Sequence, residues 1–469
     1  MNPNSFFRRF GGQFAIILCF LIIIFLPRVI AGKLYLNQGN QYEVEGSFSK
    51  AALAYEDSAN RLWWVKGLIE KAAQSARQAG NIKDAISLFE TAADKDGLSS
   101  VGWISLGDLL FQSGDLKAAI ATWESVPDRT DALVRIAKAF RKLGDIQKAM
   151  NTWQEVLKID PRNSEAHYNL GLLLMTRRPK DALSELMQAI RYNQDRDALV
   201  QVLREGLNRA LLQDNLAYQL VVSGQSLASI KEWDLAQEAF LRATLHVNNF
   251  PEAWGWLGEA YQHNGKDGLP ALKKALGLNQ NSATILALYG LYYRRQNQID
   301  LAWGAYWRAS LLEPANSAWQ LVLGDLSAQK GELFQALEHY KNAVSLAPQD
   351  PIAWLGLAIF CVQYNVEVSN LGMDAALQSL KLAPNDWQSY NSMGQVLMSR
   401  GELPSAKSYY LLALKIAPNQ AEIYLHLGYL MLMQNQRDEA YNTLVKSYQL
   451  DPEGSIGWQA QRLIDQYFP

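Results

Sequence analysis

The sequence predicts an all-α superhelical solenoid of about twelve helix-turn-helix units. The first observation is a repeat of 34 residues, seen in the step from Gly290 to Gly324 and in the residue types that follow each glycine. The second is the helical spacing of apolar residues on both sides of Gly331, which indicates two helices per unit. The third is Pro348, which ends the second helix because proline lacks a backbone N–H. One unit cannot bury its apolar face alone, so we expect neighbouring units to stack.

The clearest unit covers residues 317–350, and its recurring positions have physical reasons. Gly324 and Ala336 are small, so the two helices of the unit can approach closely. Gly331 lies at the turn between the helices, where a positive φ costs glycine little. Tyr340 lies on the face of the second helix that is directed toward the next unit, so we expect it to be buried.

This pattern resembles the tetratricopeptide repeat (TPR) family. Within the unit it runs through Leu323, Gly324, Gly331, Ala336, Tyr340, Ala343 and Pro348. The resemblance covers nearly the whole chain from Leu34 to Pro452. It implies helix pairs stacked into a solenoid and a function in binding other proteins. It does not imply a particular partner, because this fold serves many functions.

Residues 1–32 form an apolar N-terminal segment that we interpret as a signal or transmembrane anchor. The anchor interpretation uses residues 14–31, which barely span a bilayer that needs about 20 apolar residues. The alternative is a signal peptide cleaved near Ala31, which gives a secreted protein. Arg8 and Arg9 favour a cytoplasmic N-terminus, and we therefore expect a single-pass membrane protein with an extracytoplasmic TPR domain.

The repeats form two blocks that are separated by a connector. Residues 33–193 are the N-terminal TPR block, and residues 217–453 are the C-terminal TPR block. Residues 194–216 have leucines in steps of four but no repeat signature, so we expect an irregular helical connector. A two-residue insertion near residues 365–372 predicts a local distortion. Residues 454–469 are predicted to form a capping helix that covers the open end of the solenoid.

Composition and motifs argue against several functions. The net charge is −2 and no basic run is present, so we expect no nucleic-acid partner. Cys19 lies in the apolar segment and Cys361 in a repeat helix, so no disulfide framework is expected, and the five histidines are scattered. No phosphate-binding glycine loop, HExxH or GxSxG motif occurs. We predict no catalytic residue, no cofactor, no metal site and no enzymatic activity.

Partners of TPR proteins commonly lie along the concave groove lined by the first helix of each unit, and the resemblance therefore implies candidate groove residues. From the fourth, eighth, ninth and eleventh units these are Lys138, Arg141, Lys142, Leu291, Arg294, Arg295, Leu321, Asp325, Asn391 and Gln395. Family members that hold chaperone C-termini pair a lysine with an asparagine four residues later in this groove. No such pair occurs here in register, so a receptor for chaperone tails is not expected.

The cationic groove residues have two interpretations. Lys138, Arg141 and Lys142, and separately Arg294 and Arg295, suit an acidic peptide or an anionic glycan. Alternatively, they are solvated helix ends, where basic side chains interact favourably with the helix dipole.

These observations predict a non-catalytic, membrane-anchored scaffold that binds a peptide or protein partner in its groove. The alternative is a carbohydrate-binding accessory of envelope polysaccharide assembly or export. That function requires exposed tryptophans and cations on one face, and Trp303, Trp307 and Arg294 are the candidates for it.

Overall fold

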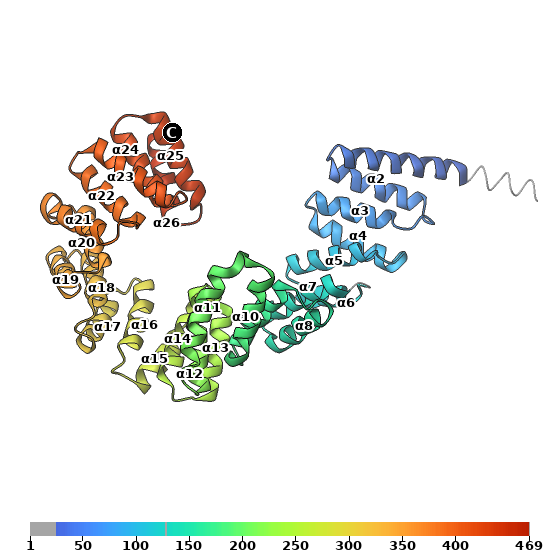
Figure 1. The fold of residues 1–469 in the computed structure, drawn as a ribbon. Helices are drawn as coiled ribbons and strands as arrows, with labels where there is room; N and C mark the ends of the chain where they lie inside the picture. Colours follow the sequence, from blue (N-terminus) through green and yellow to red (C-terminus); the bar gives the residue numbers. More distant parts are fainter. Residues whose placement is uncertain (1–24, 127–128, 469) are drawn as a thin grey trace, which may run out of the picture. The chain divides into compact units, whose positions relative to one another are not determined.

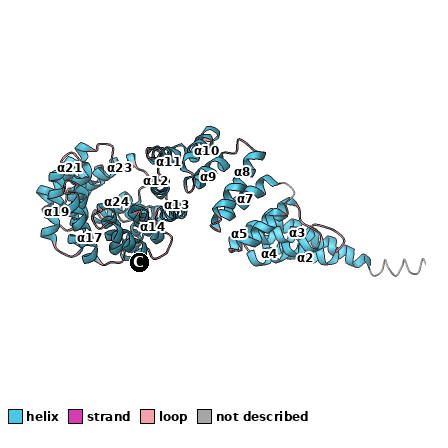
Figure 2. Cartoon of the chain, turned by 90° about the horizontal axis from the view of Figure 1, so that it is seen from below, coloured by secondary structure: helices cyan, strands magenta, loops and turns pink. Residues whose placement is uncertain are grey.

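A computed structural model describes residues 25–126 and 129–468 of the chain. Within these ranges every regular element is a helix, and no strand occurs (Figure 2). Helices alternate as the first and second members of helix-turn-helix units, and neighbouring helices pack against each other (Figure 1). The predicted fold class, an all-α solenoid of about twelve such units, is confirmed.

The chain divides into two compact halves, Met1–Ala239 and Phe240–Pro469. The N-terminal half contains a helix over residues 25–44, followed by α2 (Phe48–Arg61), α3 (Leu68–Gln78), α4 (Ile82–Lys95), α5 (Ser100–Ser113), α6 (Leu116–Glu124), α7 (Arg129–Lys142), α8 (Ile146–Ile159), α9 (Ser164–Met175), α10 (Pro179–Tyr192), η1 (Gln194–Arg196), α11 (Asp197–Ala210) and α12 (Leu216–Ser229). The boundary between the halves falls inside α13 (Trp233–His246).

The C-terminal half continues with the same alternation. Its helices are α14 (Pro251–His263), α15 (Leu269–Leu278), α16 (Ala283–Arg295), α17 (Ile299–Leu312), α18 (Ser317–Gln329), α19 (Leu333–Leu346), α20 (Pro351–Gln363), η2 (Val368–Gly372), α21 (Met373–Leu382), α22 (Trp387–Ser399), α23 (Leu403–Ile416), α24 (Ala421–Met433), α25 (Arg437–Leu450) and α26 (Ser455–Tyr467). The first helices of the units are the helix over residues 25–44, α3, α5, α7, α9, α12, α14, α16, α18, α20, α22 and α24.

Inside a unit, a glycine of the first helix faces a large side chain of the second helix. A Cβ atom at Gly324 would lie 3.0 Å from the ring of Tyr340, and one at Gly394 would lie 2.5 Å from the ring of Tyr410. Tyr340 is only 5% exposed, and its ring centroid lies 4.8 Å from that of Phe360 in the next unit. The recurring glycine therefore sets the helix spacing, and the aromatic side chain joins one unit to the next.

The turns between paired helices use left-handed backbone conformations. Gly331 has a φ of +81°, and Asn297 and Asn435 take its place in other units with φ values of +55° and +61°. Lys231 occupies the turn between α12 and α13 with a φ of +66°, which is an unfavourable conformation for a side chain of this kind.

Two segments depart from the alternation. The first contains η1 and α11, after which α12 packs against α9 as well as α11. The second is η2, a π-helical segment that follows Glu367, whose φ is +49°. This segment lies where the sequence insertion predicted a distortion.

The predicted single-pass membrane location is contradicted by the structure. Neither residues 25–126 nor residues 129–468 include a helix with the length and apolar character that a membrane crossing requires. Most of the apolar segment, residues 1–24, lies outside the described residues. Its described end is part of the helix that packs on α2, where the Ser58 hydroxyl donates to the Gly32 carbonyl at 2.9 Å and the Arg28 guanidinium donates to the Asn60 carbonyl at 2.8 Å. Ala31, at the predicted cleavage position, lies within this helix.

Candidate functional site

The predicted groove residues lie on first helices, and several of them contact the next first helix. Lys138 Nζ on α7 lies 2.8 Å from Glu165 Oε1 on α9. Arg294 Nη2 on α16 lies 3.4 Å from Asp325 Oδ2 on α18. We call the surface made of the predicted groove residues and the side chains that contact them the first-helix face. It is described below separately for each half of the chain.

In the N-terminal half, the three predicted cations of α7 surround one pocket of about 380 Å³, which we call the α7 pocket. Its lining comes from α5, α7, α8, α9 and α13, and consists of Phe111, Lys138, Arg141, Lys142, Trp153, Asn169 and Asp234. Lys142 Nζ lies 4.6 Å from the centroid of the Phe111 ring. The sequence therefore located the cations of this pocket but not the aromatic, amide and acidic residues that complete it.

Arg141 is paired with two carboxylates that the sequence did not predict. Its guanidinium donates to Glu232, which precedes α13, and to Asp234 in the first turn of α13 at 3.1 Å. Burial of the guanidinium lowers the pKa of Arg141, but Asp234 and Glu232 outweigh this effect and raise the pKa above its ordinary value. This ion-pair network joins side chains more than 90 residues apart in the sequence.

In the C-terminal half, Arg294 and Arg295 do not form one cationic cluster. Arg294 pairs with Asp325, whereas Arg295 makes a bidentate ion pair with Glu259 of α14 at 2.6 and 2.7 Å. Glu259 is only 4% exposed. The hydrogen bond to Glu259 raises the pKa of Arg295, so this guanidinium is a fixed charge that neutralises a buried carboxylate.

The other predicted residues of these units are mainly structural. Leu291 is half-buried, and Leu321 packs against the core that contains Tyr340. Asp325 accepts a hydrogen bond of 2.5 Å from the Tyr340 hydroxyl. Asp325 therefore links an inter-unit ion pair to the buried aromatic side chain.

Asn391 and Gln395 belong to a hydrogen-bond chain that includes two residues missed by the sequence analysis, Glu422 and His426. Gln395 Nε2 lies 2.8 Å from His426 Nε2, and His426 Nδ1 lies 3.0 Å from Asn391 Oδ1. Asn391 Nδ2 donates to Glu422 Oε1 at 3.2 Å. Burial lowers the pKa of His426 to about 4 and raises the pKa of Glu422, although the Asn391 hydrogen bond opposes the latter shift.

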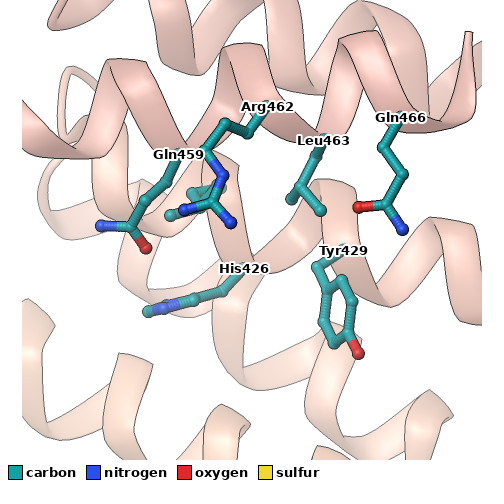
Figure 3. Close-up of a pocket in the computed structure, with 7 residues that line it drawn as sticks. His426, Tyr429, Gln459, Arg462, Leu463 and Gln466 are labelled. Atoms are coloured by element: carbon teal, nitrogen blue, oxygen red, sulfur yellow. The ribbon is translucent and has the colours of Figure 1, made fainter.

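His426 also lines a pocket of about 330 Å³ between α24 and α26, which we call the α26 pocket. Figure 3 shows side chains of α26 and α24 directed toward one another: Gln459, Arg462, Leu463, Gln466, His426 and Tyr429. Arg462 is exposed and has no ion-pair partner among the described residues. Residues 454–469 were predicted only as a capping helix, and the sequence pattern indicates no binding role for α26.

The tryptophans proposed for carbohydrate binding are partly structural. Trp303 Nε1 donates to the Ser327 hydroxyl at 3.2 Å, and the Trp303 ring stacks on Trp307 with the centroids 6.2 Å apart. Trp307 is 44% exposed. A more open pair is Trp63 and Trp64, which are 65% and 43% exposed in the loop between α2 and α3.

The first-helix face offers charged, amide and aromatic side chains, which are suited to binding. Groups of three or more metal-ligating side chains are absent from residues 25–126 and 129–468. Arg141, Arg295, Glu422 and His426, whose pKa values are shifted, all lie on this face and are held by neighbouring side chains. Their arrangement supports recognition of polar or acidic groups.

Comparison with known families detects TPR repeats in both halves of the chain. A TPR repeat model matches residues 137–176. A second model, described as tetratricopeptide repeat, matches residues 70–129 and 290–351. A third model with the same description matches residues 388–420. The repeats inferred from the spacing of glycine, alanine and aromatic residues are therefore recognised independently.

The chain is also similar to individual proteins. It is 22% identical over 278 residues to the BBSome complex member BBS4 of Bos taurus, and the match covers 58% of this chain. The chain spans about half the length of this curated relative, since the match covers 48% of it. Among solved structures, yeast Tom70 aligns over 93% of this chain and 95% of its own, with 14% identity and a TM-score of 0.44. A tetratricopeptide repeat protein from Parabacteroides merdae aligns over 53% of this chain and 98% of its own, with 17% identity and a TM-score of 0.44.

Proposed function

We propose that this chain is a non-catalytic protein-interaction scaffold that binds a peptide or protein partner on its first-helix face. The TPR repeats support a scaffold function in general, and the matching relative is described as a member of a protein complex. The predicted groove residues that reach the surface, such as Lys138, Lys142 and Gln395, remain proposed contact residues, with the exposed side chains of the two pockets added to them.

One observation carries this proposal: the α26 pocket presents an exposed cation without an ion-pair partner in the described chain. Elsewhere on the first-helix face, Arg141 and Arg295 are already neutralised by carboxylates of the chain itself. Arg462 instead lies beside the apolar Leu463 and the phenol of Tyr429. A carboxylate of a partner would form a charge-assisted hydrogen bond with Arg462 while its aliphatic portion covers Leu463.

Affinity capture from the native organism, followed by quantitative mass spectrometry, tests the proposal. The bait is the full chain, beside an Arg462→Ala variant. The matched control is Lys415→Ala, because Lys415 is exposed on the second helix α23. We expect a protein that is enriched by the wild-type chain and by the control variant. Its recovery with Arg462→Ala should fall about tenfold, as for the loss of one charged hydrogen bond.

Two results would contradict the proposal. Equal enrichment by all three baits would place the interaction away from the α26 pocket. If the full chain enriched no protein, the proposed scaffold function would be wrong.

The pocket between α2 and α3 favours a second candidate function, which is binding of an anionic carbohydrate. It has a volume of about 600 Å³ and is lined by Trp63, Trp64, Arg28, Lys66 and Lys95 among others. An exposed indole offers an apolar face to a sugar ring, and the cations would pair with its acidic groups. Calorimetric titration with an oligogalacturonate tetramer should show binding that the Trp63→Ala/Trp64→Ala variant lacks. Equal binding of neutral maltotetraose, or no binding of either sugar, would exclude this candidate.

A further inference from the structure

The turn between α12 and α13 brings an acidic segment of the chain onto the cationic cluster of α7. Glu232 and Asp234 both accept hydrogen bonds from the Arg141 guanidinium, with Asp234 at 3.1–3.2 Å. The Glu232 and Asp234 side chains are 26% and 54% exposed, so this network is only partly shielded from solvent. We call residues 230–234 the acidic corner.

The acidic corner is held there by the packing of its own helices. α12 packs against α9, and Leu172 and Met175 of α9 are both fully buried. Arg177, which follows α9, donates to Glu238 of α13 at 3.2 Å. The chain itself, through α12, therefore covers the first-helix face at α9 of the fifth unit. At α7 of the fourth unit, the acidic corner covers this face only in part.

The uncovered part of the α7 pocket retains groups that suit a carboxylate. Lys138 forms an ion pair with Glu165 in which both side chains are exposed to solvent. Lys142 lies over the Phe111 ring. Trp153, another lining residue, is 1% exposed, and its indole Nε1–H has no hydrogen-bond acceptor among the described residues. A buried donor without an acceptor is destabilising, and an acceptor supplied by a ligand would remove that penalty.

We propose that the α7 pocket is a binding site for an acidic segment of a protein partner, and that the acidic corner competes with the partner for Arg141. This inference rests on the proposed scaffold function and specifies the chemistry of its partner. The chain's own carboxylates show how such a segment is held: two acidic residues, two positions apart, share one guanidinium. The partner's carboxylates would replace them at Arg141 and also reach Lys138, Lys142 and the Trp153 indole.

A peptide fits these features better than a free anion. The pocket has a volume of about 380 Å³ and contains Phe111 as well as the cations, so it offers apolar surface beside the charged groups. The corner itself places Trp233 between its two acidic residues. An acidic segment with an apolar or aromatic residue between its carboxylates is therefore the expected partner chemistry.

Fluorescence anisotropy tests this inference with the full chain and a labelled peptide copied from residues 229–238. The control peptide carries Gln at the position of Glu232 and Asn at that of Asp234. In the Glu232→Gln/Asp234→Asn chain the internal competitor is neutral, so we expect this chain to bind the acidic peptide about tenfold more tightly than the wild-type chain. Adding Lys138→Ala/Lys142→Ala should reverse the gain, whereas Lys158→Ala on α8 should not. The affinity should also weaken as salt is raised.

Three outcomes would overturn the inference. Equal affinity of the wild-type and corner-neutral chains would show that the corner does not compete. Equal binding of the neutral peptide would show that the site does not select acidic groups. If a labelled DNA oligonucleotide bound as tightly as the acidic peptide and lost affinity with the same lysine substitutions, the pocket would be a phosphate-binding site instead. A thermal melt of each variant establishes that it is folded.

This test and the test of the proposed function fail independently. If no peptide binds although the full chain captures a partner, the acidic corner is only a structural ion pair and the scaffold function stands. If the peptide binds as expected but the chain captures nothing, the pocket chemistry stands and the scaffold function fails.

Discussion

His426 illustrates how burial on the first-helix face controls the charge of a single side chain. Its two ring nitrogens contact Gln395 and Asn391, and burial lowers its pKa from 6.5 to about 4. The folded state therefore binds fewer protons than the unfolded state between these two values. The corresponding stability is fully present above pH 6.5 and is lost as the pH falls toward 4.

The first prediction concerns this pH dependence. Between pH 7 and pH 4, the wild-type chain should lose free energy of unfolding on the order of 3 kcal/mol through His426. Urea unfolding at several pH values, compared with a His426→Gln variant that cannot titrate there, isolates this contribution. The comparison is needed because Glu422, whose pKa is raised by burial, contributes with the opposite sign. Parallel pH profiles of the two proteins would contradict the prediction.

The second prediction concerns the buried ion pair of Glu259. Arg295→Ala should lower the free energy of unfolding by about 3 kcal/mol, because it leaves a carboxylate that is 4% exposed without its bidentate partner. Arg294→Ala is the matched control, since Arg294 makes a longer and more exposed contact with Asp325 and should cost less than about 1 kcal/mol. Denaturant unfolding of both variants measures the difference. Similar costs would mean that the two arginines are equivalent.

At the scale of single residues, the sequence predicted which helix each candidate lies on but not what it contacts. Lys138, Arg141 and Lys142 were assigned to the groove from their register in the repeat, as the family resemblance implies. The Glu232 and Asp234 partners of Arg141 were missed because they depend on α12 packing against α9. That packing follows from the non-repetitive α11, for which the 34-residue pattern contains no information.

At the scale of elements, the turn and the helix pair are specified by local chemistry. Gly331 connects α18 to α19 with a φ of +81°, whereas Gly304 lies inside α17 with no side chain near its Cβ position. The same residue type therefore has opposite roles at these two positions.

The third prediction uses this pair of glycines. Gly331→Ala should destabilise the chain by about 1–2 kcal/mol, because an L side chain is strained in the left-handed region. Gly304→Ala should stabilise it by about 0.5–1 kcal/mol, because alanine favours a helix interior and no clash opposes it. Thermal unfolding of both variants is the measurement. If both substitutions shift the melting temperature in the same direction, the turn assignment is wrong.

The helix pairs were predictable because each unit repeats its own spacing rules, with a small residue facing an aromatic one. The structure at the end of the apolar N-terminal segment was not predictable from the sequence. Apolar residues of a first helix and of a membrane span have the same character in the sequence, and the contacts of Arg28 and Gly32 with α2 distinguish them only in the structure.

At the scale of the whole molecule, the two helices of each unit have different functions. The second helices supply the aromatic side chains that bury the core, such as Tyr340 and Tyr410. The first helices contribute side chains to the inter-unit ion pairs and to both pockets that we propose as contact sites, together with residues of α8, α13 and α26. A solenoid of this kind can hold a partner on one face while its core remains unchanged.

Hydrogen–deuterium exchange of the full chain, alone and with the captured partner, tests this difference most directly. We predict that the partner slows amide exchange in first helices, in particular α7, α24 and the adjoining α26, and leaves the second helices α4 and α23 unchanged. Protection confined to second helices, with the two pockets exchanging as in the free chain, would contradict the account.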